Sequence, residues 1–267
     1  MVIVMLDVDG YLGKLGDEIK KNNFEAHKKL FTLCYQINRF CQIFKYELTV
    51  DENDHYGIVA TLLFFKLHDT YQTVVLLYLY GLDTQARILN RSMLEGLWVL
   101  KSLYYQPEET FKLLLEDEYY KKLNLLHDIQ NNRDYFYEYI TKNNTIDINQ
   151  EIRKLEDKMK SLGIKKVRKI NVKEIALNTD SHEEYYYIYK LLCRDVHVDT
   201  RQLTDYFITD ENGKITGFRP FPSTNNIEEI LLTTAELILK AVIFVSKILN
   251  VDKKDEIKYY INQIQQF

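Results

Sequence analysis

Residues that interrupt helices are scarce in this chain. Its 267 residues include only nine glycines and three prolines, which leaves few points where a helix must end and favours long helices. The three cysteines, Cys34, Cys41 and Cys193, form neither a disulfide framework nor a zinc-binding spacing. A reducing compartment is the simplest setting for such a chain, and we expect a cytoplasmic protein.

Long apolar runs and an excess of positive charge are missing as well. No stretch reaches the roughly twenty apolar residues that a membrane span needs, and the opening MVIVML lacks the basic start and cleavage site of a signal peptide. We therefore expect no membrane contact. The net charge of −4 excludes a globally basic nucleic-acid binder but leaves a local basic patch open.

What the sequence does contain is helical periodicity along most of its length. Apolar spacing and capping residues predict helices at 14–48, 55–80, 83–106, 107–141, 152–162, 182–197, 224–249 and 252–267. Alternation and turn residues of a β-hairpin occur only near 206–218. We predict an all-α fold in which residues 1–267 form a single multi-helix bundle. Its parts are a core at about 14–205, a small hairpin at 206–219 and C-terminal helices at 224–267.

One expected helix carries charge among apolar residues. In GLDTQARILNRSMLEGLWVLKSLYYQ, the residues Arg87, Arg91 and Glu95 follow one another at four-residue steps and so share a helical face. Buried charge is tolerated only when it is paired or used. Two interpretations are open. Arg91 binds a phosphate or carboxylate, with Glu95 orienting it or acting as a base and Arg87 adding charge, or the pair is structural and sets the helix register.

A second candidate group lies at the end of the helix expected at 182–197. His197 follows Arg194 by three residues and shares a predicted stripe with Tyr186, Tyr189 and Cys193. A histidine in this setting can exchange protons near neutral pH. The alternative is a histidine that only interacts with the dipole of its helix.

The segment IKKVRKINVK at 164–173 is the one basic cluster. We expect Lys165, Lys166, Arg168 and Lys169 either to contact phosphates or to form a solvated loop.

Two further motifs carry little weight. The dipeptides His68-Asp69 and His127-Asp128 are poor evidence for a metal site, because adjacent residues on a helix point about 100° apart. We expect no metal or cofactor. Asp7 and Asp9 resemble the motif of aspartyl phosphotransferases, but no alternating strand–helix chain follows, so we expect a turn.

The blocks LYGLDTQARILNRSMLEGLWVLKSLYYQPEE and YYYIYKLLCRDVHVD together resemble a bacterial all-helical domain family of unknown function. Its members carry an Arg-x-x-x-Glu helix followed by Pro-Glu, and later a helix that ends in Val-His. The resemblance covers about residues 55–201 and matches at Arg91, Glu95 and His197. Cys193 stands where such proteins often have serine.

This group in turn is similar to the HEPN class of helical proteins, many of which are metal-independent ribonucleases of toxin and phage-defence systems. Those enzymes usually place more residues between the arginine and the histidine, whereas Arg194 and His197 are separated by two. The resemblance implies a HEPN-like, homodimeric ribonuclease that acts on RNA. His197 would be the general acid or base, Arg194 and Arg91 would stabilise phosphate charge, and Glu95 would hold Arg91. The alternative is a non-catalytic helical module that binds a protein partner or a small anionic ligand through the same polar pocket.

Overall fold

The structure is a computed structural model. It describes residues 2–3, 8–132, 147–194, 203–204, 206–218, 224 and 226–267. The predictions for the end of the helix at 107–141 and for His197 lie outside these residues. Contacts divide the chain into two compact units, one formed by Met1–Tyr104 with Ile175–Phe267 and the other by Tyr105–Glu174.

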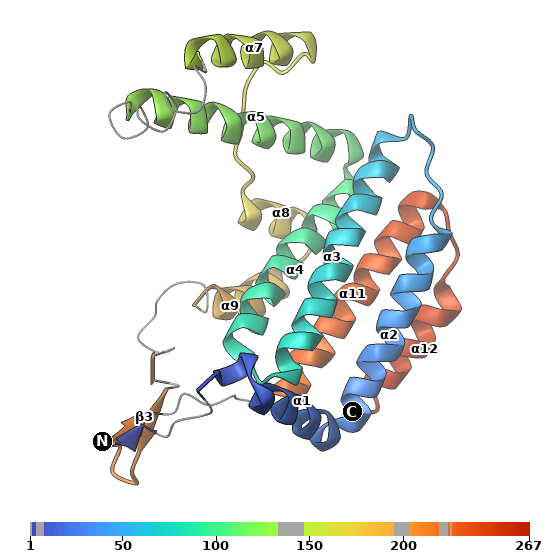
Figure 1. The fold of residues 1–267 in the computed structure, drawn as a ribbon. Helices are drawn as coiled ribbons and strands as arrows, with labels where there is room; N and C mark the ends of the chain where they lie inside the picture. Colours follow the sequence, from blue (N-terminus) through green and yellow to red (C-terminus); the bar gives the residue numbers. More distant parts are fainter. Residues whose placement is uncertain are drawn as a thin grey trace. The chain divides into compact units, whose positions relative to one another are not determined.

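The first unit is a helical bundle. Its long helices are α1 (Lys14–Ala26), α2 (Lys28–Glu47), α3 (His55–Leu79), α4 (Asp83–Tyr105), α11 (Ile227–Leu249) and α12 (Lys254–Ile264). In Figure 1, α2, α3, α4 and α11 lie side by side with similar axis directions. The contacts of α3 with α2 and α11, and of α11 with α12, hold this bundle together. These helices occupy nearly the ranges that periodicity predicts, which confirms the helical class.

The core of the first unit is centred on α3 and α11. Both helices are apolar on most of their faces, and such helices belong in an interior because burying apolar surface is the main driving force of folding. Phe64, Tyr71 and Tyr78 of α3 are fully buried, as are Ile238 and Val242 of α11. The central helices thus provide the support against which α4 is placed.

One helix boundary differs from the prediction, and two others have a clear local cause. The helix expected at 14–48 is broken at His27, whose φ of −120° and ψ of 36° are not helical; the apolar spacing continues across this break and therefore does not reveal it. Asp54 caps α3 by accepting a hydrogen bond from the Gly57 amide at 2.9 Å. Gly81 turns the chain from α3 into α4 with a φ of +69°, which glycine adopts at low cost.

The region expected as a single helix at 182–197 is partly π-helical. Glu184–Tyr189 (η2) forms a π-helical segment, and α9 (Lys190–Arg194) continues from it. A short helix, α8 (Val172–Asn178), was not predicted. The π-helical segment has a wider turn than an α-helix, and periodicity analysis assumes the narrower turn.

The second unit contains α5 (Pro107–Asn131) and α7 (Ile148–Ser161). Pro107 occupies the first turn of α5, and Glu108 and Glu109 follow it there, as expected from the fit of proline and acidic groups to a helix start. The first residue of α7 lies four positions before the predicted one. Asp147 accounts for this, because its carboxylate accepts hydrogen bonds from the amides of Asn149 and Gln150.

A small sheet completes the described structure. The predicted hairpin is present as β2 (Phe207–Thr209) and β3 (Ile215–Phe218), paired antiparallel with Phe207 opposite Phe218. A third strand, β1 (Val2–Ile3), pairs with β3 in parallel, so the order is β1-β3-β2. This strand was not expected from the sequence.

Across the part of the chain that the structure describes, no helix has the length and apolar character required to cross a membrane.

Candidate functional site

Two residues of the charged line predicted on α4, Arg91 and Glu95, form the centre of a polar cluster in the first unit. Arg91 Nε lies 3.1 Å from Glu95 Oε1. Tyr189, from the π-helical segment, donates a hydrogen bond through its hydroxyl to Glu95 Oε1 at 2.7 Å and accepts one from Arg91 Nη2 at 3.2 Å. The Arg91 guanidinium also lies 5.2 Å from the centre of the Tyr189 ring, within the range of a cation–π interaction. The three side chains form a closed triad.

The triad is partly accessible to solvent. The side chains of Arg91 and Glu95 are 24% and 33% exposed, whereas Tyr189 is buried. Arg91 Nε is buried and has no hydrogen-bond partner in the described structure, so its close approach to Glu95 is an ion pair rather than a directed hydrogen bond. The expectation of a paired arginine and glutamate one turn apart is met, and the pair is not sealed inside the core.

Protonation states in the triad follow from its contacts. Burial raises the pKa of Tyr189, the hydrogen bond to Glu95 raises it further, and the opposing effect of Arg91 is smaller. Tyr189 is therefore a neutral phenol at neutral pH. Burial alone would lower the pKa of Arg91, but Tyr189 and Glu95 outweigh it and raise that pKa, so the arginine keeps its charge. The triad thus holds a neutral hydroxyl between opposite charges.

Arg87, the third member of the predicted line, belongs to a different contact. Its Nη2 lies 3.4 Å from Asp83 Oδ2, one turn earlier on α4. Asp83 also accepts a hydrogen bond of 2.6 Å from the hydroxyl of Tyr78. The extra positive charge of the line is therefore matched by a carboxylate of the same helix, and Arg87 does not join the triad.

A second polar cluster, which sequence analysis missed, lies further along α4. Trp98 Nε1 donates to Glu184 Oε2 at 2.8 Å, and Lys240 Nζ of α11 donates to Glu184 Oε1 at 2.7 Å. Burial would raise the pKa of Glu184, but the hydrogen bonds from Lys240 and Trp98 outweigh it and hold the pKa below its usual value. Glu184 is therefore an ionised carboxylate that joins α4 and α11 to the π-helical segment.

Lys101 extends this cluster by donating to Ser181 Oγ at 2.7 Å. Burial lowers the pKa of Lys101, against the opposing effect of Glu184. The contact has the composition of a serine–lysine pair, but Ser181 is only 3% exposed, which leaves its hydroxyl out of reach of a substrate. The sequence signal that could have found this cluster is the single tryptophan, because a buried indole N–H requires an acceptor.

The residues of the stripe predicted for the helix at 182–197 differ in burial. Tyr189 is buried and Cys193 is half-buried, whereas Tyr186 and Arg194 are exposed. Tyr186 and Tyr189 lie in the π-helical segment, where the angular spacing of an α-helix does not apply. Arg194 ends α9, and His197 lies outside the described residues.

The basic segment is held by acidic residues of α5, within the second unit. Arg168 pairs through its Nε with Glu116 and through its Nη2 with Glu109 at 2.9 Å, and the Ile170 amide donates to Asp117 Oδ1 at 2.8 Å. Arg168 is exposed but has two carboxylate partners, which the sequence did not predict; its contact with a phosphate stays a prediction. The lysines of the cluster are exposed: Lys165, Lys166 and Lys169.

The two His-Asp dipeptides do not act as paired metal ligands in the described structure. His68 is fully buried, with Nε2 2.8 Å from Asn38 Oδ1, whereas the neighbouring Asp69 is exposed and accepts from Lys45 at 2.8 Å. His127 and Asp128 are both exposed. Among the described residues, no three histidine, cysteine or acidic side chains come together as a set that could hold a metal ion. Asp9 lies in a turn before the short helix Gly10–Leu12, and Asp7 is outside the description.

The fold and the cluster define a helical domain with a charged triad on an internal helix. A family model, described as a family of unknown function (DUF5677), matches residues 57–215, which is more than half of the chain. The chain belongs to this family. The matched range contains α4, the π-helical segment and β2, and it ends at the first residue of β3; it agrees with the extent of the resemblance noted in the sequence. No curated protein and no solved structure shows significant similarity to the chain.

Proposed function

We propose that the protein is a metal-independent ribonuclease of the HEPN-like kind, acting in a bacterial defence or toxin system as a homodimer. The observation that carries this proposal is the partly exposed triad of Arg91, Glu95 and Tyr189. It places a permanent cation and a carboxylate at one point of the surface, with a buried phenol beside them. The resemblance of Arg91, Glu95 and His197 to the family motif supports the same site.

The residues have the chemistry that RNA cleavage without a metal requires. The 2′-oxygen attacks the adjacent phosphorus, the bond to the 5′-oxygen breaks, and a 2′,3′-cyclic phosphate and a 5′-hydroxyl form. One group must accept the proton of the 2′-hydroxyl and another must protonate the 5′-oxygen. His197 serves as the acid or base in this proposal, while Arg91 and Arg194 stabilise the charge that develops on the phosphate.

In this proposal Glu95 and Tyr189 position the arginine. Glu95 orients Arg91 through the 3.1 Å ion pair, and Tyr189 fixes Glu95 through the 2.7 Å hydrogen bond. A guanidinium has five N–H donors, and the contacts described above involve only Nε and Nη2 of Arg91. The remaining donors are suited to phosphate oxygens, which arginine binds in a bidentate manner.

A second candidate is a non-catalytic module that binds a protein partner or a small anionic ligand at the same surface. One observation favours it specifically: Arg91, Glu95 and Tyr189 are bound to one another. A closed triad stabilises the attachment of the π-helical segment to α4 without any need for catalysis. The two candidates share residues but differ in what they predict for RNA.

The test is incubation of the purified full-length protein with RNA in the presence of EDTA. Variants Arg91→Ala, His197→Ala and Tyr189→Phe are compared with Arg39→Ala and His127→Ala, which replace exposed residues of the same types. The ribonuclease predicts cleavage that leaves cyclic phosphate ends, lost by at least 100-fold in Arg91→Ala and His197→Ala and retained in both controls.

The outcome that contradicts the ribonuclease is intact RNA with the unchanged protein, or cleavage that all variants retain. Circular dichroism of each variant shows whether it is folded. Intact RNA, together with a bound partner or anion that folded Arg91→Ala releases, supports the binding module. If only Arg91→Ala fails to fold, the Arg91–Glu95 pair has a structural role. The activity of Tyr189→Phe, which is a smaller change, then decides whether cleavage depends on the triad.

A further inference from the structure

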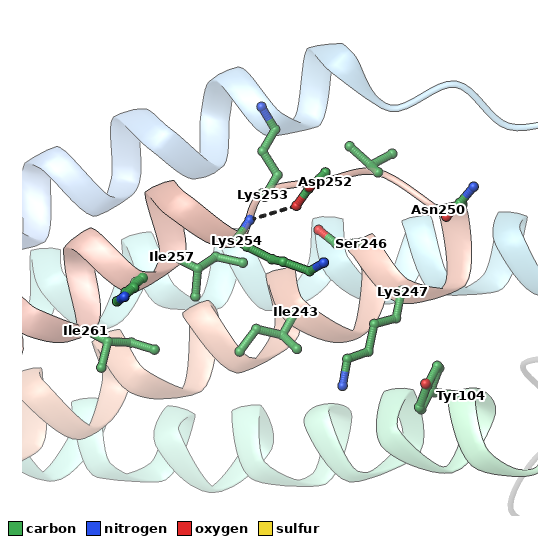
Figure 2. Close-up of a pocket in the computed structure, with 12 residues that line it drawn as sticks. Tyr104, Ile243, Ser246, Lys247, Asn250, Asp252, Lys253, Lys254, Ile257 and Ile261 are labelled. Carbon is green, nitrogen blue, oxygen red and sulfur yellow. Dashed lines mark hydrogen bonds between the residues drawn. The ribbon is translucent and has the colours of Figure 1, made fainter.

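A cavity of about 630 Å³ lies in the first unit, where the end of α11, the start of α12 and the end of α4 meet (Figure 2). Tyr104, near the end of α4, forms part of its wall. Tyr104 is 13 residues beyond Arg91 on the same helix, which corresponds to about 20 Å at 1.5 Å per residue. The cavity is therefore separate from the triad.

The floor of the cavity is apolar. Ile243 of α11 and Ile257 and Ile261 of α12 line it, and Figure 2 shows these side chains facing the space between the two helices. A second cavity of about 220 Å³ shares Ile243 and Ile261 and continues to Leu239 and Ile264. Apolar residues thus form a trough along the α11–α12 junction, with Glu236, Lys240 and Gln265 beside it in the second cavity. The trough is suited to an elongated aliphatic group.

The rim of the cavity is basic, in a chain whose net charge is −4. Four lysines line it against a single carboxylate, Asp252, whose Oδ1 already accepts a hydrogen bond of 3.1 Å from the Lys254 amide. Lys253 is neutralised by Glu47 at 2.7 Å and Glu256 at 3.2 Å. Figure 2 shows its side chain directed away from the cavity.

The other three lysines of the rim are Lys247, Lys254 and Lys258. None of them forms an ion pair with a carboxylate in the described part of the chain. Lys247 Nζ lies 5.2 Å from the centre of the Tyr104 ring, and in Figure 2 the side chains of Lys247 and Lys254 extend over the cavity. These ammonium groups provide the attraction that an anion requires.

One buried hydroxyl in the lining, that of Ser246, has no hydrogen-bond partner in the described structure. Ser246 is only 7% exposed and is among the lining residues. Buried hydroxyls are generally paired. The wall of the cavity therefore contains an unmet hydrogen bond close to the lysines, a second observation that points to a ligand.

We propose that this cavity binds a small amphipathic anion: a single carboxylate or phosphate head on an aliphatic chain. The head lies among Lys247, Lys254 and Lys258, and the chain lies on Ile243, Ile257 and Ile261. The volume of the cavity is within the range of about 300–1,000 Å³ typical of small-molecule sites. The basic rim selects the sign of the head group and the apolar trough selects the tail.

The test is isothermal titration calorimetry of the full chain with ligands that share one tail and differ in the head. Dodecanoate and dodecyl phosphate are compared, below their micelle concentrations, with dodecanol and dodecyltrimethylammonium; acetate and inorganic phosphate test the head alone. We expect one site per chain for the two long anions, at least tenfold weaker binding of dodecanol, and no binding of the cation, acetate or phosphate.

Variants assign the binding to this cavity. Lys247→Glu combined with Lys254→Glu is expected to weaken dodecanoate binding by at least tenfold and to leave dodecanol binding unchanged. The matched control, Lys21→Glu with Lys29→Glu, changes the net charge equally at exposed positions of α1 and α2 and should retain dodecanoate binding. Equal affinities for all four long ligands, or no binding of any of them, would overturn the proposal without reference to a variant. A free inorganic phosphate that binds as well as dodecyl phosphate would overturn the role of the trough.

Discussion

The hydroxyl of Tyr189 donates a 2.7 Å hydrogen bond to Glu95, although 94 residues separate the two in the sequence. The contact joins the π-helical segment to the middle of α4 and completes the triad with Arg91. It is also the contact that distinguishes a positioned glutamate from an ordinary helical ion pair, because a one-turn pair alone leaves both side chains free to move.

Tyr189→Phe removes only the hydroxyl of this contact. A hydrogen bond to a charged group contributes about 1–3 kcal/mol, and partial exposure of Glu95 places the expected loss of unfolding free energy at about 1–2 kcal/mol. Urea unfolding measures it. Tyr187→Phe, at a side chain that is 72% exposed, should change stability by less than about 0.5 kcal/mol. Equal values for the two variants would mean that the bond contributes nothing.

Glu184→Ala tests the second cluster. It leaves the indole N–H of Trp98, a fully buried residue, without its acceptor, and it removes the carboxylate that Lys240 binds. We expect a loss of about 2 kcal/mol, typical of an unpaired buried donor. Trp98 is the only tryptophan, so its fluorescence reports both the local change and unfolding. Glu183→Ala, at the exposed neighbour, is the control, and an unchanged emission maximum in Glu184→Ala would contradict the assignment.

His68 makes stability depend on pH. Burial, and to a smaller extent Lys45, lower its pKa from 6.5 to about 4. Between these two values the unfolded chain binds a proton that the folded chain does not, so stability is complete above pH 6.5 and falls as the pH falls toward 4. This group accounts for about 2 kcal/mol between pH 7.5 and 4.5.

The check is urea unfolding at both pH values, for the unchanged protein and for His68→Gln. Because the carboxylates contribute equally to both proteins, their effect cancels in the comparison. The variant should lose about 2 kcal/mol less than the unchanged protein on acidification. The same loss in both would show that His68 is protonated in the folded state at the ordinary pKa.

The attachment of the basic segment to α5 predicts a protease phenotype. Replacing Glu116 by Gln and Asp117 by Ala removes the buried carboxylates that hold Arg168 and the Ile170 amide. Trypsin should then cleave after Lys165, Lys166 or Lys169 several-fold faster, because cleavage requires local opening of the chain. Mass spectrometry identifies the sites. Glu118→Ala, at an exposed position of the same helix, should leave the rate unchanged; identical rates in both variants would show that the segment is not held.

The sequence predicts much of the helical fold because local rules dominate it. The ends of α4 follow from Gly81 and Asp83 before it and from Pro107 after it. The Arg91–Glu95 pair follows from the spacing of four along one helix. Helix α7, by contrast, begins earlier than expected, because Asp147 caps it and a polar side chain in a loop was not recognised as a cap.

Contacts between distant segments could not be predicted in the same way. Nothing local to Arg91 indicates Tyr189, and nothing local to Trp98 indicates Glu184, since each pair is joined only when α4 and the π-helical segment pack together. Likewise, Arg168 in a run of lysines looks solvated until α5 supplies Glu109 and Glu116. Periodicity identifies which residues share an element, whereas partners across elements depend on the tertiary arrangement.

The π-helical winding of Glu184–Tyr189 allows the residues at its two ends to contact the same helix, α4. In an α-helix, residues five apart are rotated by about 140°, so Glu184 could not reach Trp98 and Lys240 while Tyr189 reached Glu95. The widened turn brings positions five apart closer to one side. Deleting a single residue from this stretch would restore α-helical winding, and the chain would then lose either the Glu184–Trp98 or the Tyr189–Glu95 hydrogen bond. The same deletion would rotate Arg194 at the end of α9 to a different direction.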